Sequence, residues 1–307
     1  MFDIVGKRLW YFCISGTIIL AGIISLIVFG LEPGVEFSSG SLLTIDFEPS
    51  VTTPQLKQAL GELGYASAII QTTGEGHFLV RLPELTGADR AALETALTSK
   101  VGQLEIKGFD SVSPMIARET TRNAAIAVAI SAVGMLLYIS WAFHRMPNPF
   151  RWGTCAIVAM MHDLLIVLGV FAVFGVTLGW QIDLMFVTGI LTLVGYSVND
   201  TIVVFDRIRE NLLKSGGIDF ETVVNNSLLE TMSRSLITGI GVIFVLIALL
   251  LMVGASIQNL IVVLLVGIPF GTYGSICIAS PLLIVWRKGE WGRFVGRRPA
   301  AVAVKGK

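Results

Sequence analysis

An acidic residue, Asp200, lies within an apolar stretch of the sequence and is the strongest candidate for chemistry. The stretch begins near Ile182, and the charged sequence that follows begins at Asp206. If the stretch is a membrane-spanning helix, the helical rise places the Asp200 carboxylate roughly 9 Å inside that boundary. A carboxylate there is costly to keep ionised unless a cation or hydrogen bonds compensate, so its expected chemistry is to bind and release a proton. The alternative is a carboxyl group that only hydrogen-bonds a neighbouring helix.

Arg234 stands at the start of the next apolar stretch and is the obvious counter-ion for Asp200. An opposite charge within a few ångströms favours the ionised carboxylate, so protonation of Asp200 would change its attraction to Arg234. Asn199 directly precedes Asp200, and we group the three residues as a candidate proton-coupling site. The competing interpretation is that Arg234 extends its charged end from a helix terminus into water.

His162 and Asp163 lie near the middle of another apolar stretch. A histidine there could relay protons, because both of its charge states are accessible near neutral pH. It could equally be a neutral side chain that hydrogen-bonds across helices. Asp163 needs either a partner or a proton, because it is a carboxyl group at mid-membrane depth.

Small and polar residues recur at helical spacing within the apolar stretches. Such residues typically mark the side of a transmembrane helix that packs on its neighbours. We therefore expect helix contacts along three faces, which consist of Thr188, Thr192, Gly195 and Asn199, of Arg234, Thr238 and Gly241, and of Gly267, Gly271 and Gly274.

The composition is that of an integral membrane protein. Of the 307 residues, 54% are hydrophobic and only 14% are charged, against about 25% charged residues in a soluble domain. Nothing in the composition indicates a nucleic-acid partner. The three cysteines, Cys13, Cys155 and Cys277, lie in apolar stretches without metal-ligand spacing, so we interpret them as small hydrophobic residues and predict no metal site.

Six apolar stretches predict six transmembrane helices. The first, at 9–31, follows Lys7 and Arg8; it is too long for a signal peptide and lacks a small-residue cleavage site. The other five stretches lie at 123–143, 152–174, 182–205, 236–253 and 260–286.

The segment between the first two stretches, 32–122, has the character of a small soluble domain. Alternating residues predict strands at 41–47, 68–72, 77–82 and 104–112, the second and third joined by a turn at 73–76, and capping signals predict helices at 53–63 and 86–101. This β-α-β-β-α-β order is typical of a ferredoxin-like fold. The predicted division is therefore 1–31, 32–122, 123–286 and a basic tail at 287–307.

The positions of Lys and Arg predict the orientation in the membrane. They concentrate at the N-terminus, in the loops 144–151 and 206–235, and in the tail, whereas the loops 175–181 and 254–259 contain none. By the positive-inside rule both termini are cytoplasmic and the 32–122 domain is extracytoplasmic. Within the 206–235 loop, Asp219 follows a Gly-Gly break and can cap a helix that we expect to lie along the inner membrane surface.

Several motifs resemble those of the SecF family of bacterial protein-export membrane proteins, within the SecD/SecF group of the RND superfamily. They comprise 194–201 continuing to 206–211, the triplet 161–163, and the segments 233–238, 271–275 and 280–283. The resemblance covers essentially the whole chain. It implies an inner-membrane subunit that pairs with SecD, assists the SecYEG channel, and uses the proton motive force, without a cofactor, to help draw unfolded substrate proteins across the membrane. It also implies that Asp200 is the proton-responsive carboxylate and Arg234 its partner.

Two motifs depart from the family pattern. Ser39 stands in Phe37-Ser38-Ser39-Gly40 where the family tends to have the first of two glycines, and Ser233 and Gly239 flank the arginine motif in place of threonine and serine. Two other functions remain compatible with the sequence. One is an RND-type exporter of small molecules or lipids that acts without SecD, and the other is a structural assembly subunit without proton chemistry. We do not expect the protein to be an enzyme.

Overall fold

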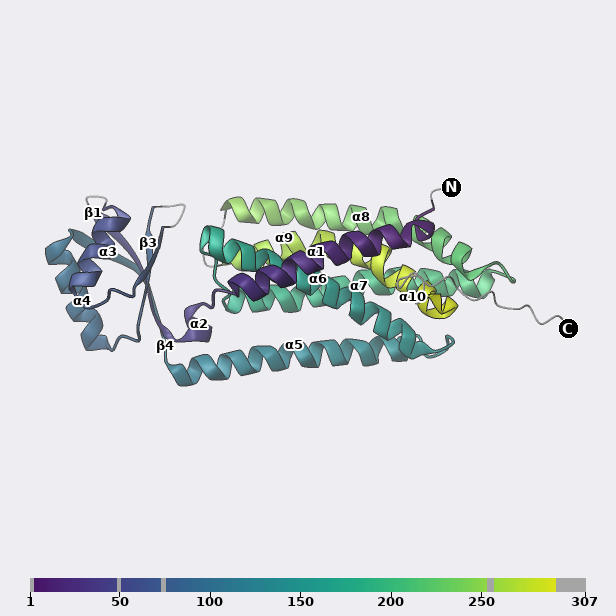
Figure 1. Cartoon of the computed structure of the whole chain (residues 1–307), viewed down its shortest axis with the longest axis horizontal. Coiled ribbons are helices and arrows are strands. Elements are labelled where there is room, and N and C mark those ends of the chain that lie inside the picture. Colours follow the sequence, from purple (N-terminus) through teal and green to yellow (C-terminus); the bar gives the residue numbers. More distant parts are fainter. Residues whose placement is uncertain (1–2, 49–50, 73–75, 253–256, 291–307) are drawn as a thin grey trace.

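The computed structural model describes residues 3–48, 51–72, 76–252 and 257–290. A long helical bundle carries a small α+β domain at one end (Figure 1). Among the described residues, six helices are long and apolar enough to span a membrane. The first five are α1 (Arg8–Phe29, preceded by the short turn η1, Val5–Lys7), α5 (Pro114–Ala142), α6 (Pro149–Leu178), α7 (Leu184–Lys214) and α8 (Phe220–Met252). The sixth consists of α9 (Gln258–Tyr273), a π-helical segment η3 (Gly274–Ala279) and α10 (Ser280–Lys288).

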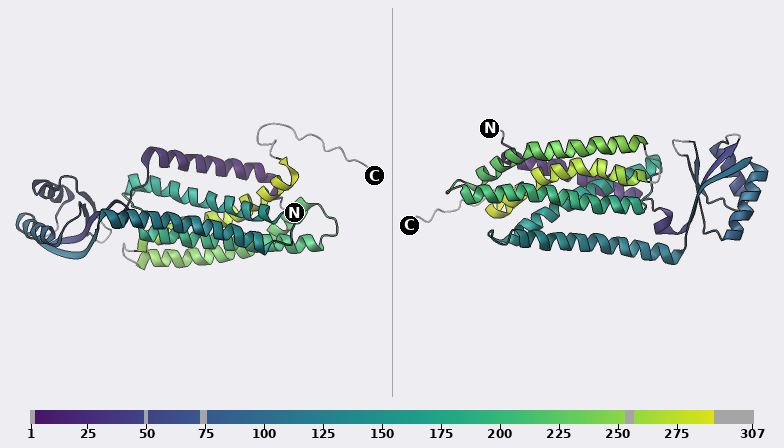
Figure 2. Two further views of the ribbon diagram at one scale, coloured as in Figure 1. Left: turned by 90° about the horizontal axis from the view of Figure 1, so that it is seen from below. Right: turned by 180° about the vertical axis from the view of Figure 1, so that it is seen from behind.

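Helices α6, α7 and α9 form the centre of the bundle, and the other helices pack around them. In Figure 2, α1 lies along α6 and α8 lies beside α7 and α9. The centre is apolar on all sides: Phe171, Leu193, Phe205 and Ile261 are each at most 1% exposed. A helix that is hydrophobic on most sides belongs in a core or in a membrane. The three central helices are of this kind apart from a few polar residues, and they are both the core of the bundle and candidate membrane spans.

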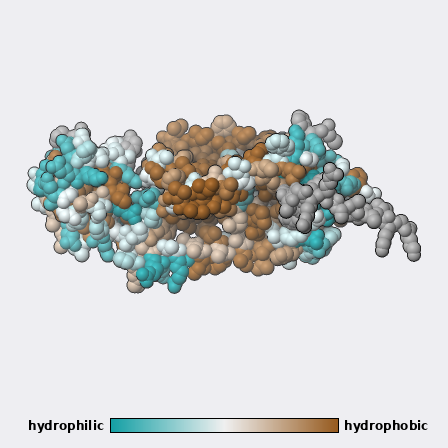
Figure 3. All heavy atoms as spheres, in the orientation of Figure 1, coloured by the Kyte–Doolittle hydropathy of each residue, from teal (hydrophilic) through white to brown (hydrophobic). Residues whose placement is uncertain are grey.

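The outer helices turn apolar side chains away from the protein. Ile27, Ile130, Ile237 and Leu251 are all more than 60% exposed. In Figure 3 a hydrophobic belt crosses the bundle between two hydrophilic ends. Such a belt has the position expected of the surface that contacts lipid.

The small domain contains a four-stranded antiparallel sheet and two helices. The elements occur in the order β1 (Gly40–Glu48), α3 (Thr53–Glu62), β2 (Ile69–Thr72), β3 (Phe78–Leu82), α4 (Gly87–Lys100) and β4 (Gln103–Val112). The strand order is β2-β3-β1-β4. Thr52 and Thr86 begin the two helices with capping boxes, which satisfy free amides of the first turn. Leu43, Leu56 and Leu97 form part of the core between sheet and helices.

The strands and helices of the small domain lie within one or two residues of the ranges that the sequence predicts. A short additional helix, α2 (Val35–Ser38), precedes β1. Residues 73–75 of the predicted turn, part of the predicted 254–259 loop and the tail from residue 291 onward lie outside the described residues.

Helix α8 corrects one prediction. The amphipathic sequence after Asp219 does not form a separate surface helix but is the first part of a continuous helix of 33 residues, about 50 Å long. Its apolar side chains already have a protein partner. Ser227 accepts a hydrogen bond from Asn211 at 2.9 Å, and Phe220, Val224 and Leu228 belong to the bundle core. This face therefore packs against the end of α7 instead of lying on lipid.

Ser39 adopts a backbone conformation that normally requires glycine. Its φ is 64° and its ψ is 167°, a region in which a side chain is strained. Gly40 follows with φ 119°, and a Cβ at Gly40 would lie 2.6 Å from the carbonyl oxygen of Leu82. The turn into β1 therefore keeps its double-glycine geometry although one of the two residues is a serine.

Candidate functional site

The Asp200 carboxylate lies on α7, half-buried, at the contact between α7 and α8. Oδ1 accepts a hydrogen bond from the Ser235 hydroxyl at 2.6 Å, and the side chain of Ser275 in η3 lies beside the same carboxyl group. Oδ2 is buried and has no hydrogen-bond partner among the described residues. One oxygen of this carboxyl group is thus satisfied and the other is not, as expected of a group that can hold a proton.

The structure does not place Arg234 against Asp200. Arg234 is exposed on α8, while the next residue, Ser235, is buried and points to the carboxylate. Adjacent helical residues project about 100° apart, so only one of the two can face α7. Asn199 is likewise exposed on α7. Of the three residues grouped as a proton-coupling site, only Asp200 turns toward the interior of this chain.

The predicted contact face of α7 requires a similar correction. Thr188, Thr192 and Asn199 are exposed, and a Cβ on Gly195 would have no atom within 4 Å. The side of α7 that packs instead contains Gly189, Leu193 and Ser197, and small residues on both helices allow α7 and α9 to approach closely: a Cβ on Gly189 would lie 2.8 Å from the Val263 side chain of α9. A Cβ on Gly267 of α9 would lie 2.4 Å from the Leu193 side chain.

Asp163 and His162 form a second polar site, in the interior of the bundle. Asp163 is 0% exposed and His162 is 4% exposed. His162 Nδ1 lies 2.9 Å from Asp163 Oδ1, and the Ser197 hydroxyl donates to Asp163 Oδ2 at 2.6 Å. The imidazole ring stacks on Tyr273, with 6.0 Å between the ring centroids.

Two glycines of the sixth span make room for this polar site. A Cβ at Gly274 would lie 2.5 Å from Asp163 Oδ1, and a Cβ at Gly271 would lie 3.4 Å from Ser197 Cβ. With Gly267, they form the small-residue seam along which α9 and η3 approach α6 and α7. Close approach of this kind is the general use of small residues between membrane helices.

Hydroxyl groups occupy the space between the two carboxyl groups. The Thr201 hydroxyl lies 2.8 Å from the Ser275 hydroxyl and donates to the Ser197 carbonyl oxygen at 3.0 Å. Sequence analysis missed Ser197, Thr201 and Ser235 as site residues. The available signal was the one-turn spacing of Ser197 and Thr201, but the face of α7 that contains Asn199 has polar residues at the same spacing and is the more polar of the two.

Six apolar helices around one buried and one half-buried carboxyl group, with an α+β domain at one end, define a polytopic helical membrane protein with ionisable groups between its helices. Comparison with known proteins leads to the same class of protein. Residues 92–289 match the family model "Protein export membrane protein SecD/SecF, C-terminal", and residues 24–51 match the SecD/SecF GG motif. The chain belongs to the SecD/SecF family of protein export membrane proteins.

The SecF relatives match this chain over their whole length, whereas the longer SecDF protein matches it over only a part of its length. Protein translocase subunit SecF of Thermobaculum terrenum is 42% identical, covering 99% of this chain and 100% of the relative. SecF of Anaerolinea thermophila is 39% identical, covering 98% and 100%. The crystal structure of SecDF from Thermus thermophilus, described as a translocon-associated membrane protein, superposes with TM-score 0.84 at 30% identity, covering 94% of this chain and 39% of that chain. The chain thus spans about two-fifths of the SecDF protein.

Proposed function

We propose that the chain is a SecF-type accessory subunit of the Sec translocon, which promotes protein translocation with energy from the proton motive force. The observation that carries the mechanism is the Asp200 carboxyl group, half-buried between α7 and α8 with Oδ2 lacking a partner in the described chain. A proton that crosses the membrane releases about 2.3 kcal/mol per 100 mV. No cofactor is required, because the gradient supplies the energy.

Protonation of Asp200 changes the contact between two helices. The ionised carboxylate accepts the Ser235 hydroxyl strongly, because hydrogen bonds to charged groups are about twice as strong as neutral ones. The neutral carboxyl group accepts this hydrogen bond more weakly than the ionised carboxylate does. It also requires fewer polar groups around it. Binding or release of a proton at Asp200 therefore favours one of two arrangements of α7 relative to α8. This is the local two-state event that a proton-driven machine requires.

A partner subunit completes the site. The exposed residues Asn199 of α7 and Arg234 of α8 are costly to leave against lipid. SecD is the natural partner, because in the SecDF protein of Bacillus subtilis the matching region is 38% of one chain. In this arrangement Arg234 acts at the interface with SecD, and SecYEG, the unfolded substrate protein and the surrounding lipids are the other binding partners.

The orientation follows from charge. The start of α1 and the ends of α7 and α10 lie at the end of the bundle opposite the small domain (Figure 1). Their terminal residues are Arg8, Lys214 and Lys288, and such basic residues mark the cytoplasmic side. We infer that the protein lies in the cytoplasmic membrane with both termini inside. The 32–122 domain is then extracytoplasmic, and its element and strand orders are those of a ferredoxin-like fold.

The test is protein export in cells with Asp200→Asn, with abundance and association with SecD monitored. Asp206→Asn is the matched control, because Asp206 is an exposed carboxylate on the same helix that pairs with Arg209 at 2.8 Å. We expect loss of export for Asp200→Asn alone. Normal export would favour the structural assembly subunit, and a chain that functions without associating with SecD would favour the stand-alone exporter.

A further inference from the structure

The His162–Asp163 pair has no task in the mechanism above, although it is the most deeply buried ionisable group of the bundle. Asp163 is 0% exposed, and no Lys or Arg forms an ion pair with it within the described ranges. His162 is the cation candidate in contact with it, at 2.9 Å. An isolated ionised carboxylate in such a place is expensive, so the number of protons on the pair decides its energy.

The hydrogen bonds around the His162–Asp163 pair are compatible with two protonation states. With one proton on Nδ1 and an ionised carboxylate, both Asp163 oxygens accept hydrogen bonds, but the pair keeps a buried negative charge. One additional proton removes that charge. On the ring it would occupy Nε2, which is buried and has no partner in the part of the chain that the structure describes. Two states that differ by one proton are therefore each incompletely satisfied, as a group that exchanges protons requires.

Hydroxyl groups connect the pair to Asp200. Ser197 contacts Asp163 at 2.6 Å, Thr201 contacts Ser275 at 2.8 Å, and Ser275 lies beside Asp200. Ser275 also has the Gly271 carbonyl oxygen at 3.0 Å. A hydroxyl group has one hydrogen and two lone pairs, so Ser275 cannot donate to all of these neighbours at once. When Asp200 gains or loses a proton, the hydroxyl hydrogen of Ser275 must therefore rotate toward a different acceptor.

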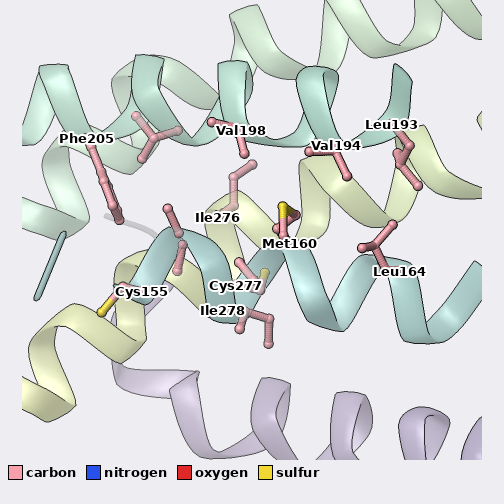
Figure 4. Close-up of a cluster of buried hydrophobic side chains, with 14 of the residues drawn as sticks. Cys155, Met160, Leu164, Leu193, Val194, Val198, Phe205, Ile276, Cys277 and Ile278 are labelled. Carbon is pink, nitrogen blue, oxygen red and sulfur yellow. The ribbon is translucent and has the colours of Figure 1, made fainter. Parts of the chain in front are cut away.

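The surroundings favour exchange between these groups over exchange with water. Apolar side chains from α6, α7 and η3, among them Met160, Val198 and Ile276, are buried together in the interior of the bundle (Figure 4). The other titratable groups near the pair are phenols and a thiol, Tyr273 on α9, Tyr11 on α1 and Cys277 on η3, which are neutral at ordinary pH.

We propose that His162–Asp163 is a second proton-binding site, and that Asp200 exchanges protons with it through the Ser275, Thr201 and Ser197 hydroxyls. In each transfer a hydroxyl oxygen accepts one proton and gives up its own, so one proton moves and no electron changes hands. Ser197 and Thr201 are one turn apart without a hydroxyl–hydroxyl contact, and Ser197 rotates from Asp163 toward Thr201 to complete the relay. The inference rests on the proposed function, because it assumes that Asp200 is protonated and deprotonated during export.

Infrared titration of the purified complex with SecD tests the proposal. The stretch of a protonated carboxyl group is visible directly, and the bands of the two residues are assigned by their loss in Asp200→Asn and Asp163→Asn. We expect a separate Asp163 band in the wild-type complex. The midpoint of the Asp200 band should move by about one pH unit in Asp163→Asn, as for interacting sites, and should not move in Asp206→Asn. An unmoved Asp200 midpoint would overturn the proposal.

Further variants keep the test decisive. If Asp163→Asn does not accumulate, His162→Gln replaces it, with the same expected movement and the same contradicting result. Ser197→Ala should preserve the fold and slow gradient-driven export several-fold, while an unchanged rate would remove Ser197 from the relay. Failure of the proposed function is distinguishable, because gradient-driven export would then survive Asp200→Asn, whereas failure of this inference alone leaves Asp200 essential and its midpoint independent of Asp163.

Discussion

The amide of Gly34 donates a hydrogen bond to the carbonyl oxygen of Ile182 at 2.7 Å. Ile182 in turn donates to Glu32 at 2.8 Å, so a short parallel bridge joins the linker after α1 to the residues just before α7. Arg81 of β3 donates to the Pro33 carbonyl oxygen at 2.6 Å. The residues just before the helix that carries Asp200 are therefore connected, through the linker, to β3 of the small domain, and a shift of α7 can reach that domain along this path.

Replacing Gly34 with alanine should uncouple this contact. A Cβ at Gly34 would lie 2.8 Å from the Ile182 oxygen and 2.7 Å from Glu36 Oε2, and overpacking of this kind costs about 1–3 kcal/mol. We expect export to fall several-fold while the chain still accumulates and associates with SecD. Gly134→Ala, where a Cβ meets no atom within 4 Å, is the control. Equal export from both variants would show that the bridge transmits nothing.

Acidification should tighten the same junction. Burial raises the pKa of Glu36 above its ordinary value of 4.5, the neighbouring Asp183 and Asp110 add to the rise, and Arg81 opposes it. A carboxyl group whose pKa is raised by folding binds its proton more tightly in the folded junction, so stability is gained as pH falls toward 4.5 and lost as pH rises through the raised value. Hydrogen-exchange protection of the Ile182 amide should increase on acidification.

Glu36→Gln provides the control for that measurement, because it leaves a neutral group of the same shape. The pH dependence of protection should become weaker, with a remainder from Asp183, whose pKa is also raised by burial. An undiminished pH dependence in Glu36→Gln would assign the effect to other groups.

Ser39→Gly should stabilise the protein. Glycine relieves the strain at φ 64°, worth about 1–3 kcal/mol, and loses about 0.5–1 kcal/mol through the greater freedom of the unfolded chain. We expect the free energy of unfolding to rise by about 1 kcal/mol, measured by thermal or denaturant unfolding in detergent. A destabilised Ser39→Gly would mean that the serine side chain makes a contact worth more than the strain.

Gly274→Ala should destabilise the bundle through Asp163. The new methyl group would lie 2.5 Å from Asp163 Oδ1, and we expect a loss of about 1–3 kcal/mol in unfolding free energy. Gly241→Ala, where a Cβ has open space, should cost nothing measurable. In a double-mutant cycle, Asp163→Ala should reduce the cost of Gly274→Ala, and strictly additive effects would contradict a direct contact.

The sequence predicts the elements of this fold better than the directions in which their residues point. Apolar length locates the six long helices, alternation locates strands such as the one that contains Ser41, and capping signals locate helices such as the one that follows Thr86, because these signals are local. Which of Arg234 and Ser235 faces Asp200 depends on how α8 is rotated against α7. That rotation is determined by the whole interface, including the close approach at Gly239, where a Cβ would lie 3.6 Å from the Tyr196 hydroxyl of α7, and no local pattern encodes it.

Two further features depend on tertiary structure in the same way. The apolar face after Asp219 fits lipid and protein equally well, and only the presence of the α7 end makes it a continuation of α8. The π-helical segment Gly274–Ala279 has no distinctive local pattern, since its residues are compatible with an ordinary helix. Its geometry places Ser275 between Thr201 and Asp200, which sequence spacing alone could not predict.

The most direct test of the central claim is translocation into inverted membrane vesicles, measured with the proton gradient present and after a protonophore has collapsed it. In wild-type and Asp206→Asn vesicles, the gradient should raise the yield of translocated protein. In Asp200→Asn vesicles with equal amounts of the complex, the yield should be the same with and without the gradient. If the gradient stimulates Asp200→Asn vesicles as much as the wild type, Asp200 does not couple proton movement to export.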